Sequence, residues 1–210
     1  MINVLIISSY RLICASLSQI IDNVPEFHVV GVAEELADVA SVVKEHPVDV
    51  IVFEVSSPSV ESFDLIKDLI AVNSDLKILI LSTQTADPLP SQFLQAGAKG
   101  FITRQASVTE VTKAIKEVAA DRRYLGIDCA QQMALGRMSG DSNPFSTLSA
   151  REMQVMMMIT AGSKVMSISD QLCLSPKTIN TYRYRLFSKL GVDSDVSLTR
   201  LAIRRGLMEA

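Results

Sequence analysis

Strand-like and helix-length segments alternate through the first 120 residues, and this alternation constrains the fold more than any other feature. Apolar runs such as Val48–Glu54 and Lys77–Ser82 are continuous, which is typical of strands buried on both faces. The pattern predicts an α/β domain, a flavodoxin-like, doubly wound parallel sheet of five strands. The expected strands are Asn3–Ile7, His28–Val32, Val48–Glu54, Lys77–Ser82 and Gly100–Thr103, and the expected helices are Arg11–Asn23, Glu35–Glu45, Val60–Val72, Pro88–Ala96 and Val108–Ala120.

The working site of such a sheet lies at the carboxyl ends of its central strands. Strands one, three, four and five end near Ser8, Glu54, Ser82 and Arg104, so these positions are where chemistry is expected. No nucleophile–base pair, glycine-rich phosphate loop or metal-ligand cluster accompanies them. We therefore expect neither an enzyme nor a bound cofactor or metal.

The alternation weakens after residue 121. Ala130–Leu135 could form a short helix, and Gly136–Pro144 has the Gly, Ser, Asn and Pro content of a linker. We therefore expect three parts: an α/β domain over 1–121, a linker with a short helix over 122–143, and a second domain over 144–210.

The second domain is expected to be all-α, with four helices. Ser149, with Glu152 three residues later, makes a capping box that opens the first helix. Ser175 and Pro176 open the third, where proline at the first helical position loses no hydrogen bond. The expected helices are Arg151–Ala161, Met166–Leu172, a third that begins at Ser175 and ends at Gly191, and Val196–Arg205.

The formal net charge of −3 hides an asymmetry between the two domains. Residues 1–120 carry 8 Lys and Arg against 15 Asp and Glu, whereas residues 143–210 carry 9 against 5. A basic helical domain behind an acidic α/β domain suggests different partners, with a polyanion for the second. Random drift in surface charge is the alternative.

Apolar runs and cysteines limit the setting of the protein. No apolar run approaches the ~18 residues of a membrane helix, and the start of the chain lacks the marks of a secretory signal. The three cysteines are far apart and form no CxxC motif. We expect a soluble, cytoplasmic protein without disulfides or membrane contact.

The third helix of the second domain carries two contrasting faces. Apolar residues recur at helical spacing and should face the core, whereas the opposite face carries polar residues and cations. Asn and Thr can reach base edges in the major groove of DNA, and Lys and Arg can hold the phosphate backbone. A solvated amphipathic helix is the alternative. The core face is Ile179, Tyr182, Leu186 and Leu190, and the other face is Lys177, Asn180, Thr181 and Tyr184, flanked by Arg183, Arg185 and Lys189.

The segments FSTLSAREMQVMMMITAG and SISDQLCLSPKTINTYRYRLFSKLGV resemble the LuxR-type helix-turn-helix of NarL/FixJ response regulators. AQQMAL, SPKTINTYRYRLFSKL and QTADPLP place the chain closest to the GacA/UvrY/LetA group. The resemblance covers essentially the whole chain. It implies a receiver domain joined to a DNA-binding domain that acts as a dimer on a promoter palindrome. It assigns base-facing positions to Asn180, Thr181 and Tyr184, backbone contacts to Lys177, Thr178, Arg183, Arg185 and Lys189, and a dimerisation surface to Leu198, Leu201 and Ala202.

The α/β domain departs from this family where its chemistry should occur. Receivers of this kind need an acidic pair after strand one, an Asp ending strand three and a Lys ending strand five. Here Ser8 and Ser9 replace the pair, Glu54 the Asp and Arg104 the Lys. One carboxylate and two hydroxyls make a poor Mg²⁺ site, and Arg104 adds repulsion. We expect a pseudo-receiver that neither binds Mg²⁺ usefully nor accepts a phosphoryl group.

The switch residues of the family, Ser82 and the aromatic Phe101, are retained. Two consequences remain open. Glu54, paired with Arg104, could mimic the phosphorylated charge and hold Ser82 and Phe101 in the active arrangement. Alternatively, the pocket has decayed and the domain only dimerises or docks. Glu supplies one negative charge where phosphate supplies nearly two, so neither consequence is favoured.

These observations together predict an atypical response regulator that binds double-stranded DNA as a homodimer, independently of aspartyl phosphorylation. The alternative is a protein-interaction modulator that heterodimerises with a phosphorylatable relative. Recognition-helix residues such as Lys177, Asn180 and Thr181 speak against the modulator, since it would not need to keep them.

Overall fold

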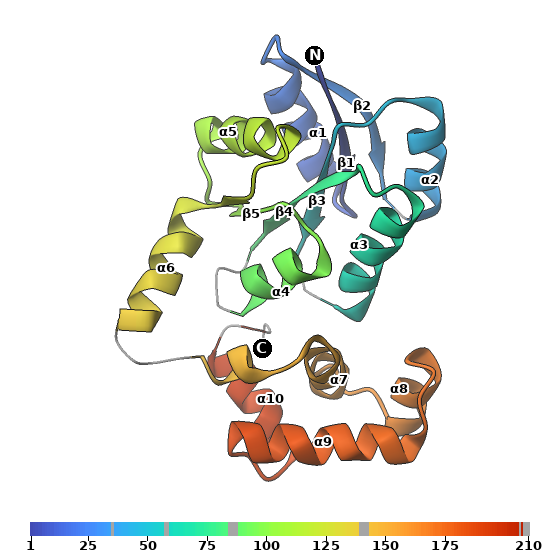
Figure 1. The fold of residues 1–210 in the computed structure, drawn as a ribbon, viewed down its shortest axis with the longest axis vertical. Coiled ribbons are helices and arrows are strands. Elements are labelled where there is room, and N and C mark those ends of the chain that lie inside the picture. The colour runs from blue at the N-terminus through green and yellow to red at the C-terminus, as the bar shows by residue number, and fades with distance from the viewer. Residues whose placement is uncertain (35, 57–58, 84–87, 139–142, 206, 208–210) are drawn as a thin grey trace.

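The chain forms an α/β domain and a helical domain that lie against each other in the computed structural model (Figure 1). The structure describes residues 1–34, 36–56, 59–83, 88–138, 143–205 and 207. Residues 84–87 of the QTADPLP stretch and residues 139–142 of the expected linker lie outside the described residues. Within them, no helix has the length and apolar character needed to cross a membrane.

The α/β domain is built on a parallel sheet of order β2-β1-β3-β4-β5-β6. The five expected strands are confirmed, but the count of five is wrong because a sixth strand pairs with β5. This strand has two residues and lies in the segment expected to be a linker. So short a segment leaves no alternation to detect. The strands are β1 (Ile2–Ile7), β2 (Phe27–Ala33), β3 (Val50–Val55), β4 (Lys77–Ser82), β5 (Gly100–Thr103) and β6 (Tyr124–Leu125).

Helices cover both faces of the sheet, as the continuous apolar strands require. One core lies beneath α1 and α5, and a second lies beneath α2, α3 and α4. Strand β3 is buried along its whole length. The helices are α1 (Arg11–Asp22), α2 (Leu36–Glu45), α3 (Val60–Val72), α4 (Leu89–Ala96) and α5 (Val108–Ala119).

The segment after the α/β domain is more ordered than its composition suggested. Helix α6 (Ile127–Met138) extends the short helix expected over Ala130–Leu135 in both directions. Gly126 precedes it and donates its backbone N–H to the carbonyl of Phe101 over 2.8 Å. The Ile127 N–H is bound by the Glu110 carboxylate at 2.8 Å. These contacts tie the start of α6 to β5 and α5.

The helical domain consists, among the described residues, of a short 3₁₀ turn, η1, and four α-helices. The predicted capping box is present: Ser149 accepts from the Glu152 backbone, and Glu152 accepts from that of Ser149. Ser175 caps the third helix, and Gly191 ends it with a φ of 64°. The elements are η1 (Pro144–Thr147), α7 (Ala150–Thr160), α8 (Val165–Gln171), α9 (Pro176–Leu190) and α10 (Asp195–Arg204).

Glu152 joins three elements of the helical domain. Its side chain is 6% exposed, and its Oε2 accepts from Lys189 Nζ at 2.7 Å and from the Ser149 backbone at 2.9 Å. Lys189 also donates to the Thr147 carbonyl at 3.3 Å. Burial raises the pKa of Glu152, but the hydrogen bonds from Lys189 and Ser149 outweigh it and hold the pKa below its usual value. The carboxylate thus connects η1, the start of α7 and the end of α9.

The two domains meet where α7 lies against α3 and α4. Gln154 on α7 donates to the Asp64 carboxylate on α3 at 3.1 Å. Gln92 on α4 donates to the Leu148 carbonyl, just before α7, at 3.4 Å. The buried side chains beneath α3 and α4 continue into the core of the helical domain without a break. Helix α9 lies on the far side of this contact, away from the sheet (Figure 1).

We expect Glu152→Gln to lower the free energy of unfolding of the helical domain by about 1–3 kcal/mol near pH 7, since the charged hydrogen bonds are weakened. The folded-state pKa of Glu152 is lowered, so its contribution is present above the ordinary carboxyl pKa. It is lost as the pH falls through the folded value, and the variant should approach the wild type in acid. Urea unfolding of the wild type and the variant, followed by the amide signals of α9 at pH 7 and at acid pH, measures this difference in stability. Glu117→Gln, on the surface of the other domain, should leave α9 unchanged; equal effects would contradict the assignment.

Candidate nucleic-acid interface and sheet-edge pocket

The outer face of α9 is an exposed polar stripe. Lys177, Thr181, Tyr184, Arg185 and Ser188 are all exposed, and their spacing places them on one side of the helix. The Tyr184 residue is 67% exposed, although its ring contacts that of Phe187 edge-on. The expected core residues Ile179, Leu186 and Leu190 are buried, and Tyr182 packs against them.

Four of the predicted DNA-contacting side chains are bound within the domain, and one of them is Thr181, whose Oγ1 donates to the Lys177 carbonyl at 3.0 Å. Arg183 makes a bidentate ion pair with Asp195, in which both N–O distances are 2.7 Å, and its guanidinium lies over the Phe187 ring. Lys189 binds Glu152, as described above. Thr178 is hydrogen-bonded through Oγ1 to the capping Ser175 at 2.8 Å. In this structure Arg183 and Lys189 therefore hold α9 to α10 and α7, and Thr178 supports the cap.

The predicted dimerisation surface needs correction. Leu198 and Ala202 are 0% exposed, because this stripe of α10 packs into the domain's own core. Leu201 is partly buried at its edge. Apolar side chains on another face of α10 are exposed instead, Val196 at 63% and Ile203 at 37%. The family resemblance, which supplied this prediction, did not distinguish the inner stripe of α10 from the outer one.

At the carboxyl edge of the sheet, the Glu54 carboxylate is buried and fully engaged. Its side chain is 2% exposed. Ser8 Oγ donates to Oε2 at 2.7 Å, and Ser56 Oγ donates to Oε1 at 2.7 Å. Arg104 donates through Nη2 to Glu54 Oε1 and to Ser56 Oγ, and its guanidinium lies 5.7 Å from the Tyr10 ring centroid. Residues from the ends of β1, β3 and β5 thus converge on one carboxylate.

The mouth of this pocket is open and rich in hydroxyl groups. A hollow of about 350 Å³ is lined by Ser8, Ser9, Glu34, Glu54 and Ser56, among others. Ser9 is exposed at its rim, and Glu34 is paired with Arg11 at 3.1 Å. Among the described residues, no three His, Cys, Asp or Glu side chains gather as a metal site would require.

Both expected switch residues are fully buried. Ser82 and Phe101 are each 0% exposed, and the Ser82 carbonyl accepts from the Arg104 backbone at 2.9 Å. The Phe101 ring lies 5.9 Å from that of Phe93 on α4, and Phe93 stacks on Phe63 of α3 at 4.3 Å. An aromatic row therefore leads from β5 toward the contact between the domains.

Two residues of the network around Glu54 were not foreseen from the sequence: Ser56, which binds Glu54, and Tyr10, which lies against Arg104. Ser56 follows Glu54 by two residues, and residues two apart on a strand point to the same face, so its spacing was a usable signal. Tyr10 lies beyond the end of β1, and no periodic pattern indicates that its ring would meet Arg104. Asp195, the partner of Arg183, also carried no sequence signal.

Both halves of the chain match known protein families. The response regulator receiver domain matches residues 4–116, and the bacterial regulatory proteins of the luxR family match residues 146–202. The chain belongs to the response regulators that join a receiver domain to a LuxR-type helix-turn-helix domain, a class of transcriptional regulators.

Individual relatives cover the whole chain. Response regulator UvrY of Escherichia coli strain K12 is 42% identical over 212 residues, spanning 100% of this chain and 97% of that protein. Response regulator GacA of Pseudomonas aeruginosa strain PAO1 is 38% identical over 212 residues, spanning 100% and 99%. The expected kinship with this group is confirmed.

Solved structures agree on the fold. RcsB from Salmonella enterica serovar Typhimurium, solved bound to the promoter rprA in the presence of the phosphomimetic BeF₃⁻, has a TM-score of 0.77. The match spans 95% of this chain and 97% of RcsB at 21% identity, so it is a likeness of fold.

We expect Arg104→Met to lower the free energy of unfolding of the receiver domain by about 1–3 kcal/mol, because it leaves a buried carboxylate with only hydroxyl donors. Arg11→Met is the matched control: it removes an arginine whose pair with Glu34 is exposed, and it should change stability little. Thermal unfolding followed by the amide signals of β3 and β5 gives the comparison. Equal stability of the two variants would show that Arg104 does not hold Glu54.

Proposed function

We propose that the protein is a DNA-binding transcriptional regulator whose α9 enters the major groove and whose activity is independent of aspartyl phosphorylation. The observation that carries the proposal is the exposed stripe of Lys177, Thr181, Tyr184 and Arg185 on a capped helix that faces away from the receiver domain. An α-helix with its side chains is about 10–12 Å in diameter, which suits insertion into a groove about 12 Å wide, and the 15 residues of α9 give it a length of about 22 Å.

The roles along α9 follow from side-chain chemistry and exposure. Asn180 and Thr181 present short polar groups for base edges, and Tyr184 adds a large exposed ring. Lys177 and Arg185 remain exposed and can neutralise phosphates. Arg183 and Lys189 act indirectly, by fixing the position of the helix within its domain.

Dimerisation is assigned to the exposed face of α10. Val196 and Ile203 are seven residues apart and therefore lie on the same face of the helix. Two copies of this face, related by a two-fold axis, would present two α9 helices to the half-sites of a palindrome. Leu198 and Ala202 belong to the core, and Leu201 packs at the edge of the core, on the side of α10 away from Val196 and Ile203.

Independence from phosphorylation rests on the chemistry of the sheet-edge pocket. Mg²⁺ prefers several hard oxygen ligands, and carboxylates supply the charge that holds it. Ser8 and Ser9 offer neutral hydroxyls. Of the three carboxylate residues that line the hollow, Glu34 and Glu54 are each paired with an arginine, and the third, Glu61, lies in the first turn of α3. The Arg104 guanidinium beside Glu54 would also repel a cation.

The same pair favours one fixed arrangement of the switch residues. Arg104 binds the Glu54 carboxylate with its side chain and the Ser82 carbonyl with its backbone. Phe101, three residues before Arg104, is fully buried. These contacts support the hypothesis that Glu54 and Arg104 stand in for a phosphoryl group and its cationic partner, and they give the decayed pocket less support.

Untreated full-length protein should bind a palindromic promoter probe more tightly than a scrambled one, without a phosphodonor. Lys177→Ala should weaken binding to both probes and reduce the log–log salt slope by about 0.9, as expected for one lost phosphate contact. Asn180→Ala should weaken palindrome binding by about 1–3 kcal/mol and spare the scrambled probe. Lys113→Ala, an exposed lysine on α5, is the control and should leave the slope unchanged. If Lys177→Ala had the same salt slope as the wild type, this result would contradict the assignment of the α9 surface to DNA binding.

Incubation with acetyl phosphate and Mg²⁺ should leave the intact mass of the wild-type protein unchanged. A quadruple variant, Ser8→Asp, Ser9→Asp, Glu54→Asp and Arg104→Lys, restores the carboxylates and the lysine of a phosphate-accepting pocket, and it should gain one phosphoryl group. A phosphorylated wild-type species mapped to Glu54 would refute phosphorylation independence.

A further inference from the structure

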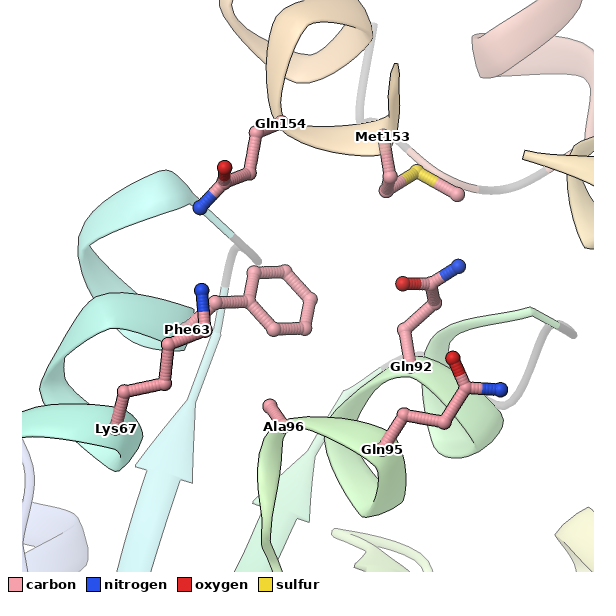
Figure 2. A pocket seen from close by; sticks show the side chains of 7 residues that line it. All are labelled: Phe63, Lys67, Gln92, Gln95, Ala96, Met153 and Gln154. Atoms are coloured by element: carbon pink, nitrogen blue, oxygen red, sulfur yellow. The ribbon is translucent and has the colours of Figure 1, made fainter. Parts of the chain in front are cut away.

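The contact between the two domains encloses a cavity of about 190 Å³ (Figure 2). Helix α3 contributes Phe63 and Lys67, helix α4 contributes Gln92 and Ala96, and helix α7 contributes Met153 with Gln154. Its walls are mainly apolar: Phe63 is 6% exposed and Met153 is 1% exposed. An apolar cavity of about 150 Å³ is large enough to hold benzene, so this one can accommodate a single aromatic ring system.

Gln92 places a buried hydrogen-bond acceptor at this cavity. The residue is 6% exposed, and its Nε2 donates to the Leu148 carbonyl at 3.4 Å, which fixes the orientation of the amide. Figure 2 shows the Gln92 oxygen turned into the cavity, toward the side where the Phe63 ring lies. Among the residues that the structure describes, no hydrogen bond is found to this oxygen. A buried acceptor without a donor costs free energy, and a ligand N–H or O–H would remove that cost.

Of the other polar residues that line the cavity, Gln95 is exposed to solvent, and Gln154 and Lys67 have partners within the protein. Gln154 donates to Asp64 at 3.1 Å and accepts from Arg151 at 2.8 Å. Asp64 also binds Lys67 at 3.3 Å, so the opposite charges at the rim compensate each other. A charged ligand would gain nothing from this rim, whereas an uncharged one would not disturb it.

We propose that this cavity binds a small, uncharged aromatic molecule that donates one hydrogen bond to Gln92 Oε1 and packs its ring between Phe63, Ala96 and Met153. The ligand would touch both domains, so it can bind only when α7 lies on α3 and α4. By linkage, it stabilises this arrangement. The arrangement leaves the outer face of α9 uncovered (Figure 1), so ligand binding should strengthen DNA binding. This last step rests on the proposed function, whereas ligand binding itself does not.

The test compares indole with benzofuran, which has nearly the same shape but lacks the N–H donor. Calorimetry on the full-length protein should show saturable indole binding and benzofuran binding weaker by about tenfold or more. Bound indole should slow amide hydrogen exchange in α3 and α4 and also in α7. Equal binding of the two compounds, no saturable binding, or slowed exchange in one domain only would overturn the proposal.

Variants locate the site independently. Gln92→Leu should bring indole binding down to the benzofuran level, and Ala96→Leu should abolish binding by filling the cavity. Gln131→Leu, at an exposed glutamine of α6 that does not line the cavity, is the matched control and should bind indole as the wild type does. If Gln92→Leu does not fold, Ala96→Leu and the two compounds still decide the question.

DNA titration with and without saturating indole separates this proposal from the proposed function. Tighter promoter binding with indole supports both. Saturable indole binding without any DNA binding supports the cavity site and counts against the proposed function. Unchanged DNA affinity despite bound indole overturns the link between the site and the arrangement of α9.

Discussion

A buried carboxylate needs hydrogen-bond donors from the protein. The arrangement of side chains at the carboxyl edge of the receiver domain's sheet follows from this requirement at Glu54. Burying an ionised group is tolerated only when it is paired and hydrogen-bonded. Here the donors come from three strand ends: Ser8 after β1, Ser56 after β3 and Arg104 after β5. The pair of Glu54 and Arg104 therefore joins the ends of β3 and β5, which are separated by β4 in the sheet. The carboxyl edge of the sheet thus carries a connected polar network around one buried carboxylate.

The fold could be predicted from the sequence because its signals are local and repeated. The boundaries of β4, β5 and α3 agree with the expectation to the residue, since apolar runs and caps mark their ends. The sixth strand could not be predicted, because Tyr124–Leu125 is too short to show a period and is specified by its pairing with β5. Helix α6 was underestimated for a similar reason. Its start depends on Glu110 of α5 and the carbonyl of Phe101, contacts that composition does not report.

The functional sites show the same difference between local signals, which the sequence carries, and contacts with other elements, which it does not. The two faces of α9 followed from spacing, since a single helix sets which side chains share a surface. Which cations on that surface stay free did not follow, because the partners of Arg183 and Lys189 come from other helices. On α10, two apolar stripes compete for the core, and packing against α7 rather than periodicity decides between them. Leu198 and Ala202 are thus inside, while Val196 and Ile203 are outside.

The sheet-edge pocket and the cavity between the domains are connected by packed side chains rather than by a shared helix or strand. The switch residue Phe101 contacts the ring of Phe93, and Phe93 stacks on Phe63. Phe63 forms one wall of the cavity against α7. Close-packed interiors transmit a change of ring position because neighbouring side chains have no free volume to absorb it. The row of rings therefore gives a physical route by which a change at Phe101 would reach the surface on which α7 rests. Under the proposed function, a receiver domain without phosphoryl chemistry would in this way still influence the position of the helix that is proposed to read DNA.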